Sequence, residues 1–320
     1  MPAEGIHLTS LREALASPRL DGPARRRLVR RDDAARFGAL LVDLPYFHRF
    51  AGEVVRYVLG VPARPSPWGP ALHEEGGAIA LLHELVRIAR RDQDETIAAI
   101  ALGLASHASI DRALHPLVNS LARLHQAGKN HDASHREVEK FQSICFHEAY
   151  MGRDLMGTPA ITAYLTIHLV EQLREPRLSA QLREAWAGAL GRAPSAAELA
   201  GFGRGYRAHT RLLGLPLGKR IAPAAAKDAA RPRYLFGPWG RFEAAVEAAV
   251  TASVPVLNAV AAALDAAPGD EDAAFGALGA ALPRGTIDPP GDATTLQVPF
   301  EARLGASVEP LGESSTAASP

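Results

Sequence analysis

The sequence of 320 residues lacks several features by which classes of protein are recognised. Its single cysteine, Cys145, excludes an internal disulfide and any zinc site built from thiolates. Its 35 Lys and Arg residues balance its 35 Asp and Glu residues, so no overall charge attracts the chain to nucleic acid or to anionic lipid. Glycine-rich phosphate loops, nucleophile elbows and dinucleotide fingerprints are also absent from the sequence. We therefore expect neither thiolate chemistry nor a stable nucleic-acid partner.

The sequence also lacks the signals that direct a chain to a membrane or across it. Its start, MPAEGIHLTSLREA, has no charged leader followed by an apolar run. No apolar window reaches the length of a membrane span, so we expect no transmembrane segment. The simplest prediction is a cytoplasmic protein, and no pattern in the sequence fixes its oligomeric state.

Helix patterns dominate the chain, whereas strand patterns are scarce. The predicted helices cover residues 8–17, 32–44, 76–91, 94–116, 135–152, 160–173, 179–190, 195–213 and 241–264. Asp94 is expected to cap the fourth of them, and Asp132 or Ser134 the fifth. We therefore predict an all-α domain over residues 1–265. Residues 266–320 are rich in Pro, Gly and Ala and predict a mostly irregular tail, with a short extended segment at 294–302.

One predicted helix carries three metal-ligand side chains at a helical repeat. The stretch GLASHASIDRALHPLVNS, residues 103–120, contains His107, Asp111 and His115, each four residues from the next. Because positions four apart lie on one helix face, His107 and Asp111 can bind the same ion or neighbouring ions. His115 precedes Pro116, which indicates either a kink or an ordinary helix end.

The next predicted helix repeats the arrangement with His135 and Glu139 in the sequence SHREVE. A single pair of this kind arises often as a solvated surface pair, but two pairs on successive helices favour a metal site. Ala108, Ile110, Leu114 and Leu117 place the first pair in apolar surroundings, where an ionised carboxylate needs a cation or strong hydrogen bonds. Imidazole and carboxylate without thiolate suit zinc, manganese or iron.

These two motifs resemble those of the bacterial zinc-dependent phospholipase C family. The matching pattern is Gly-x-x-x-His-x-x-x-Asp, a third histidine shortly after it, and His-x-x-x-Glu on the following helix. The resemblance extends upstream, because His7 lies near the N-terminus, Asp43 ends an early helix, and His73 precedes the central helix. It covers about half of the chain, from His7 to Glu139.

The resemblance implies a cluster of two or three metal ions, usually Zn²⁺, in a cleft of an all-helical fold. By position in the family, the first ion takes Asp43, His73, His107 and Asp111. The second takes His115, His135 and Glu139, with Asp43 reaching or bridging to it. His7 takes the third ion together with Asp111 and the backbone of the N-terminal residue. Here the chain departs from secreted members, which expose that terminal amine by processing, because six residues precede His7.

The same resemblance implies hydrolysis of a phosphodiester by metal-activated water, with a phospholipid or a similar phosphoester as substrate. Asp43 is the expected catalytic residue, because a carboxylate beside the ions can orient or deprotonate that water. A single-strand nuclease or nucleotidase with the same metal site is an alternative. Tyr46, Phe47 and Trp68 then either stack a base, cover an acyl-glycerol, or act as ordinary core aromatics.

Two further interpretations remain open at this stage. His131 and Asp132 form an adjacent His-Asp dyad, typical of another class of all-α metal phosphohydrolases, although they are expected in a loop. A helical scaffold with structural metal, or with none, is the non-enzymatic alternative. The other histidines are expected to be ordinary: His83 and His168 within helices, His125, His131 and His209 at the surface, His147 off the ligand face, and His48 at most an outer-shell partner.

Overall fold

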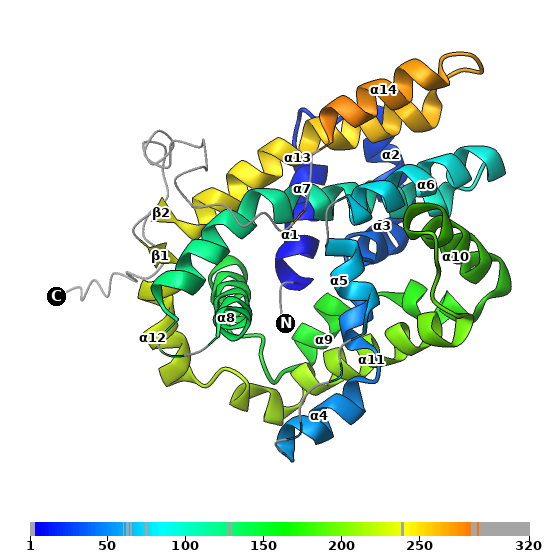
Figure 1. Cartoon of the computed structure of the whole chain (residues 1–320). Helices are drawn as coiled ribbons and strands as arrows, with labels where there is room; N and C mark the ends of the chain where they lie inside the picture. Colours follow the sequence, from blue (N-terminus) through cyan, green and yellow to red (C-terminus); the bar gives the residue numbers. More distant parts are fainter. Residues whose placement is uncertain are drawn as a thin grey trace.

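The computed structural model confirms that the protein is all-α (Figure 1). It describes residues 4–59, 61, 64, 66–73, 76–126, 128, 130–237, 240–282 and 287. The α-helices are α1 (Glu4–Ala16), α2 (Gly22–Arg30), α3 (Asp32–Gly38), α4 (Phe50–Val58), α5 (Trp68–His73), α6 (Gly77–Asp92), α7 (Glu95–Leu124), α8 (His131–Met151), α9 (Pro159–Leu165), α10 (Pro176–Leu190), α11 (Ala196–Gly214), α12 (Ala224–Tyr234), α13 (Phe242–Asp265) and α14 (Glu271–Ala281). Three 3₁₀ helices, η1 (Leu44–Phe47), η2 (His168–Arg174) and η3 (Pro216–Arg220), and one pair of antiparallel strands, β1 (Phe236–Gly237) and β2 (Gly240–Arg241), complete the described elements.

Helix α7 is the core of the molecule, and α13, α3, α6, α8 and α1 all pack against it (Figure 1). Its start is predicted correctly, because the Asp94 side chain accepts hydrogen bonds from the N–H groups of Thr96 and Ile97. Its end is not, because the helix continues through Pro116 to Leu124. The missing N–H of Pro116 is therefore tolerated inside a helix that is buried on nearly all sides.

The expectation that no segment is long and apolar enough to span a membrane is wrong. Among the described residues, Glu95–Leu124 (α7) and Phe242–Asp265 (α13) both meet that length and composition. The apolar window of α7 is 89% buried and that of α13 is 56% buried. Core helices also meet these criteria, and the burial of α7 is that of a core helix.

Helix α3 ends six residues earlier than predicted, at Gly38 rather than at residue 44. Residues 39–43 form successive turns, in which the N–H of Leu40 bonds to Phe37 O and the N–H of Leu41 to Gly38 O. Helix η1 follows directly, with Pro45 in its first turn. Asp43 therefore lies on an irregular turn between two helices. In the same turn, the carbonyl oxygen of Ala39 is free of helical hydrogen bonds within the described structure and accepts one from His107 on α7.

Two glycines let this turn approach α7. A Cβ atom on Gly38 would lie 2.1 Å from Ile100 O, and a Cβ on Gly103 would lie 1.9 Å from Ala35 O. Both distances are far below van der Waals contact, so the backbones of α3 and α7 touch only because these side chains are absent. The close contact brings the turn that carries Asp43 against the face of α7 that carries His107.

The stretch predicted as a mostly irregular tail, residues 266–320, contains one described helix. Helix α14 lies within the predicted tail and packs against α13, with Leu278 fully buried. The extended segment predicted at 294–302 lies outside the described residues. Helices α4, α5 and α12 are not predicted from the sequence, because they are short and their sequences contain Gly, Pro or many charged residues.

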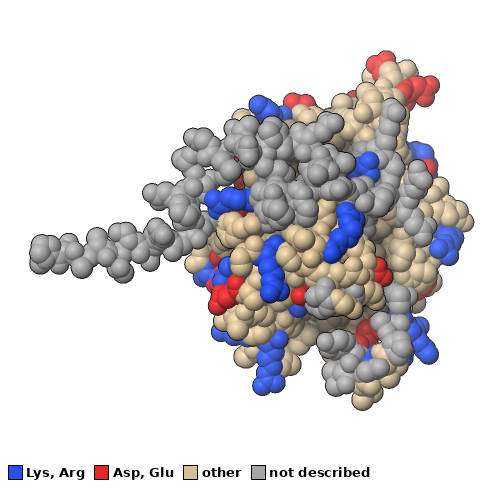
Figure 2. Space-filling model, turned by 60° about the vertical axis from the view of Figure 1, so that its left-hand side comes forward, with Lys and Arg blue, Asp and Glu red and all other residues tan. Residues whose placement is uncertain are grey.

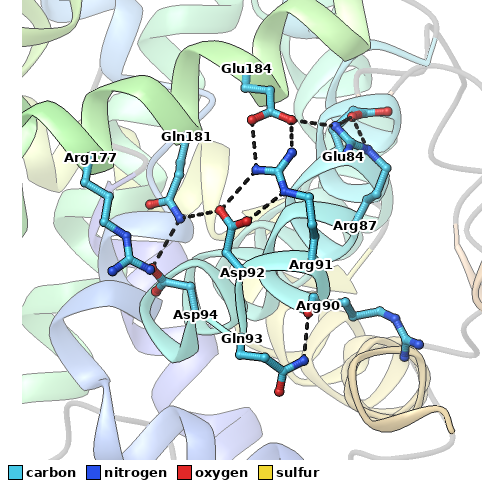
Figure 3. Close-up of polar contacts among 10 residues, drawn as sticks. All are labelled: Glu84, Arg87, Arg90, Arg91, Asp92, Gln93, Asp94, Arg177, Gln181 and Glu184. Atoms are coloured by element: carbon cyan, nitrogen blue, oxygen red, sulfur yellow. Dashed lines mark hydrogen bonds and ion pairs between the residues drawn. The ribbon is translucent and has the colours of Figure 1, made fainter. Parts of the chain in front are cut away.

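Charged residues serve mainly to join helices at the surface. At the end of α6, Arg91 pairs with Asp92 and with Glu184 of α10, and Gln181 donates to Asp92 and Asp94 (Figure 3). The side chains of Arg91 and Glu184 are largely exposed, so their ion pair contributes little to stability. On the face shown in Figure 2, basic and acidic residues are interspersed and neither sign dominates.

The one cysteine, Cys145, is buried on α8, and burial raises its pKa to about 11, so its thiol stays protonated.

A first prediction concerns the contact between α3 and α7. Gly103→Ala should lower the free energy of unfolding by about 1–3 kcal/mol, because the added methyl group forces two backbones apart. Urea denaturation measures the change. The matched control is Gly276→Ala on α14, where an added Cβ meets nothing within 4 Å; it should leave stability unchanged or raise it by up to about 1 kcal/mol. Equal effects of both substitutions would contradict the proposed contact.

A second prediction concerns His147, which joins α8 to α1. Its Nε2 lies 3.1 Å from Thr9 Oγ1, and burial lowers its pKa from 6.5 to about 4. Between these values the unfolded chain binds more protons than the folded one, so stability should fall by up to about 3 kcal/mol as pH decreases from 6.5 to 4. His147→Gln should flatten this part of the stability curve, measured by denaturant unfolding at each pH. The exposed His168 provides the control, and parallel curves for wild type and His147→Gln would disprove the assignment.

Candidate metal centre

All eight side chains predicted to bind metal meet in one region of the structure. They come from α1 (His7), the turn before η1 (Asp43), the end of α5 (His73), α7 (His107, Asp111, His115) and α8 (His135, Glu139). Seven of them line a pocket of about 250 Å³, and the eighth, His107, is fully buried. Helix α1 contacts both α7 and α8 in this region (Figure 1).

The eight residues form three groups, each able to place three ligand atoms within 4.8 Å of one another. The groups are His7, Asp43 and His107; His73, His107 and Asp111; and His115, His135 and Glu139. The third group matches the set expected for the second ion, and the other two share His107. The arrangement can thus hold two or three cations, and it does not by itself fix which metal is bound.

Asp111 is the carboxylate that connects these groups. Its oxygen atoms lie 2.9 Å from His107 Nε2, 3.2 Å from His7 Nε2 and 3.8 Å from His115 Nε2. Burial alone would raise the pKa of Asp111, but the surrounding imidazoles hold it well below its usual value. The central carboxylate is therefore ionised, and the pocket around it is built to hold positive charge.

Asp43 makes looser contacts than Asp111. Its oxygen atoms lie 3.7 Å from His73 Nε2 and 4.0 Å from His7 Nε2. Burial raises the pKa of this carboxyl group, although His107, His7 and His73 act in the opposite direction. The described contacts of Asp43 are with the first two groups, and Asp111 lies 3.8 Å from His115 of the third. That Asp43 reaches or bridges to the second ion stays a prediction.

The histidine rings are oriented as metal-ligating imidazoles are. His107 Nδ1 donates to Ala39 O at 2.8 Å, and His73 Nδ1 donates to Gly69 O at 2.9 Å. His135 Nδ1 lies 2.8 Å from Asn119 Oδ1, an oxygen that accepts its N–H. A hydrogen bond from Nδ1 to an oxygen fixes the ring and leaves Nε2 to face the pocket.

This orientation provides a test of whether a cation fits the site. In the neutral rings the Nε2 lone pairs face carboxylate oxygens, at 2.9 Å for His107 and Asp111 and at 3.3 Å for His135 and Glu139. A lone pair and an anion repel each other at these distances unless a positive charge lies between them. Without metal, that charge is a proton: burial lowers the pKa of His107, but Asp111 and Asp43 outweigh it and raise the pKa to about 9. The donor set therefore fits a metal ion.

Glu139 and His7 complete the site at its two ends. Glu139 Oε1 lies 3.5 Å from His115 Nε2 and 3.3 Å from His135 Nε2, and these imidazoles lower the pKa of Glu139 far below its usual value although burial opposes them. His7 stacks on His107 with ring centroids 3.9 Å apart, and its Nδ1 is buried without a hydrogen-bond partner in the described structure. The backbone of the N-terminal residue, expected beside His7, lies outside the described residues.

Sequence patterns miss two residues that support the site. Asn119 is buried on α7, four residues after His115, and its Oδ1 also lies 3.2 Å from His131 Nε2. The same four-residue spacing that identifies the ligands could have identified it. Glu4 is buried on α1 with Oε1 3.1 Å from His209 Nε2. The prediction that His209 is a surface residue is wrong, because His209 is buried on α11, where it faces Glu4 of α1.

The surroundings of the other histidines differ in part from expectation. Helix α8 begins at His131 and is capped by Asn130, whose side chain accepts from Ala133 N, so neither Asp132 nor Ser134 is the cap. His131 and Asp132 therefore lie on a helix, not in a loop, and both line the pocket. His147 faces Thr9 and Tyr164 rather than the ligands, His83 stacks on Phe275, and His48 lines a separate groove beside α11.

Comparison with known proteins adds no assignment. No family model, no curated protein and no solved structure matches this chain. The likeness to the zinc-dependent phospholipase C family is therefore carried by the eight residues and their spacing alone.

A third prediction concerns metal content. Full-length protein dialysed against zinc and then against metal-free buffer should retain two or three equivalents per chain by elemental analysis, as the three groups allow. His107→Ala should lose at least one equivalent, because His107 belongs to two groups. A chelator should lower the melting temperature of wild type more than that of His107→Ala, since bound metal stabilises the folded state.

The control for this experiment is His168→Ala, which removes an exposed histidine on η2, outside the three groups. It should bind zinc as wild type does. Retention of less than one equivalent by wild type, or equal retention by wild type and His107→Ala, would show that the pocket is not a metal centre.

Proposed function

We propose that this protein is a metal-dependent phosphodiester hydrolase of the zinc-dependent phospholipase C type. The observation that carries the proposal is the meeting of five imidazoles and three carboxylates in one pocket, with the Nε2 atom of every imidazole within 4.0 Å of a carboxylate oxygen. This arrangement differs from surface ion pairs. All eight side chains are largely buried, and Asp111 and Glu139 each contact more than one imidazole. Dense, mutually perturbed titratable groups in a pocket are typical of functional sites.

The residues that would hold the ions are those of the three groups, with Asp111 as their shared carboxylate. When bound, two or three Zn²⁺ ions supply an activated water near neutral pH and neutralise charge on the phosphoryl oxygens and the leaving group. The protein itself fixes three of the five imidazoles, those of His73, His107 and His135, through Nδ1 hydrogen bonds. It therefore needs no serine or cysteine nucleophile.

Asp43 is the residue that we assign to proton transfer. Asp111 has two neighbours within 3.2 Å, whereas Asp43 has none closer than 3.7 Å among the described contacts. A carboxylate with looser contacts can move and accept a proton at Oδ1 or Oδ2 more readily than one held on several sides. Asp43 also lies on a turn rather than on a helix, next to the pocket opening at Tyr46.

Arg136 is the positive group that we assign to the substrate. It is exposed on α8, directly after His135, and lines the same pocket. A planar guanidinium matches two phosphate oxygens, so Arg136 is suited to holding a phosphoryl group at the pocket rim. A pocket of about 250 Å³ accepts the phosphoryl group and its immediate neighbours, and leaves the rest of a lipid outside.

The aromatic residues favour a phosphoester without a base to stack. Tyr46 lines the pocket, but Phe47 and Trp68 are buried, with 2% and 6% of their surface exposed. Trp68 packs against Trp186 and donates its indole N–H to Glu198. Two of the three aromatics considered for a nucleotide are thus core residues. The single-strand nuclease alternative keeps the same metal site but has one stacking surface instead of three.

A fourth prediction tests this function with chromogenic phosphodiesters such as bis(p-nitrophenyl) phosphate. Zinc-loaded wild type should hydrolyse at least one diester of a small panel, and Asp43→Asn should lower kcat by about 100-fold or more. Circular dichroism and metal content should change little, because the substitution keeps the shape of the side chain. The measurement is the steady-state rate, normalised to bound zinc.

His131→Ala and Asp132→Asn provide matched controls on the pocket rim. Both should retain most of the activity, whereas the dyad-type phosphohydrolase alternative requires both residues. Full zinc loading without hydrolysis of any diester would favour the non-catalytic scaffold. An unchanged rate for Asp43→Asn would refute the assignment of Asp43 while leaving the metal centre in place.

A further inference from the structure

A second concave site lies between α4 and α11, with no lining residue in common with the metal pocket. It is a groove of about 600 Å³. One wall consists of residues 48–52, at the junction of η1 and α4, and the other consists of α11 residues from Ala197 to Ala208. Small residues form much of both walls, so the groove is wide enough for more than a water molecule.

Positive groups converge in this groove. Arg49 and Arg204 are exposed, come from opposite walls, and have no carboxylate within ion-pair distance in the part of the chain that the structure describes. Both act on His48, whose pKa is lowered by burial and then by these two guanidinium groups. The one acidic residue on the walls, Glu198, is already engaged by the N–H and hydroxyl of Ser195 and by the indole N–H of Trp68.

The backbone of Gly201 forms the surface between two of the nitrogen groups. A Cβ atom on Gly201 would lie 2.9 Å from His48 Nδ1 and 3.7 Å from Arg204 Nη2. His48 Nδ1 is buried and has no hydrogen-bond partner in the described structure. His48 Nδ1 thus packs directly against the bare backbone of α11 at Gly201, and the guanidinium group of Arg204 lies beside the same glycine.

Arg49 adds a conformational observation. It has φ = 57°, a left-handed conformation that costs energy for a residue with a side chain, and it is one of two such non-glycine residues in the described chain. This conformation places Arg49 immediately before α4, whose first N–H groups have no acceptor earlier in the helix. Non-glycine residues in this region cluster at ligand sites.

We propose that the groove between α4 and α11 binds a small organic anion, through a phosphate or carboxylate group held by Arg49 and Arg204. The apolar part of the ligand lies along Phe50 and the alanines of α11. Because the groove shares no lining residue with the metal pocket, binding there does not depend on the proposed hydrolytic activity. Two separated guanidinium groups suit several acceptor oxygens on one anionic group.

Isothermal titration of the zinc-loaded full-length chain with inorganic phosphate tests the proposal. Wild type should bind phosphate at the groove, and Arg49→Ala or Arg204→Ala should each weaken that binding by about tenfold or more. Arg204→Lys should recover part of it. Gly201→Ala should also weaken binding, because its methyl group occupies space beside the guanidinium group of Arg204. Diester hydrolysis should be unchanged in all four variants.

The matched control is Arg153→Ala, which removes an exposed arginine outside the groove. Phosphate bound at the metal centre is distinguished by Asp111→Asn, which should remove that binding and leave the groove intact. Circular dichroism checks that each variant folds. Arg49 and Arg204 are exposed, so their replacement should not unfold the chain. Equal phosphate affinity in wild type, Arg49→Ala and Arg204→Ala, or loss of all binding in Asp111→Asn, would overturn the proposal.

Discussion

The constraint on which the structure depends is the burial of negative charge beside its central helix. Asp111 is 5% exposed on a helix whose other buried positions are mostly apolar, and Asp43 is 9% exposed beside it. An uncompensated carboxylate in such surroundings costs several kcal/mol. The five imidazoles offset part of this cost when protonated, which is why the pKa of His107 rises to about 9. Cations in the pocket would offset it without binding protons, so the same residues that make the empty site costly are suited to hold metal ions.

The fold meets this constraint with two kinds of support. Helices α7 and α8 are long and well packed, and they present five of the eight ligands at four-residue intervals. The other three come from shorter elements, which must be brought to the same place from elsewhere in the chain. Gly38 and Gly103 allow the turn before Asp43 to touch α7, and Ala39 O then fixes the ring of His107. Glu4 on α1 faces His209 on α11, and His7 on the same helix as Glu4 stacks on His107.

Sequence signals within a few residues of one another predicted the features that depend on neighbouring residues, namely helix starts and the face on which a side chain lies. Asp94 marks one helix start correctly, and the helix predicted over 195–213 begins at Ala196 as α11. The spacing of the ligands on α7 and α8 places them on facing helix surfaces: His107, Asp111, His115, His135 and Glu139. The missed features depend on contacts far apart in sequence. Burial on all sides carries α7 through Pro116, and the approach of α3 to α7 ends α3 at Gly38. The hydrophobic periodicity of a segment cannot predict either effect, because both depend on contacts with other parts of the chain.

His7, Asp43 and His73 were predicted as metal ligands only from the family resemblance. No spacing connects them to one another or to α7, so the sequence pointed to them only through their order in a resemblance, and the pocket now brings them within 4.0 Å of ligands on α7 or of one another. Asn119 and Glu4 were missed because neither residue type is conspicuous and their partners, His135 and His209, lie 16 and 205 residues away.

The ligands on α7 and α8 are held by helices that their own packing stabilises, whereas those on α1, the turn and α5 depend more on the charge at the centre of the pocket. A bound cation should therefore order the site from the α7–α8 side outward, and Asp43, whose contacts are the longest, should be the least fixed of the three carboxylates.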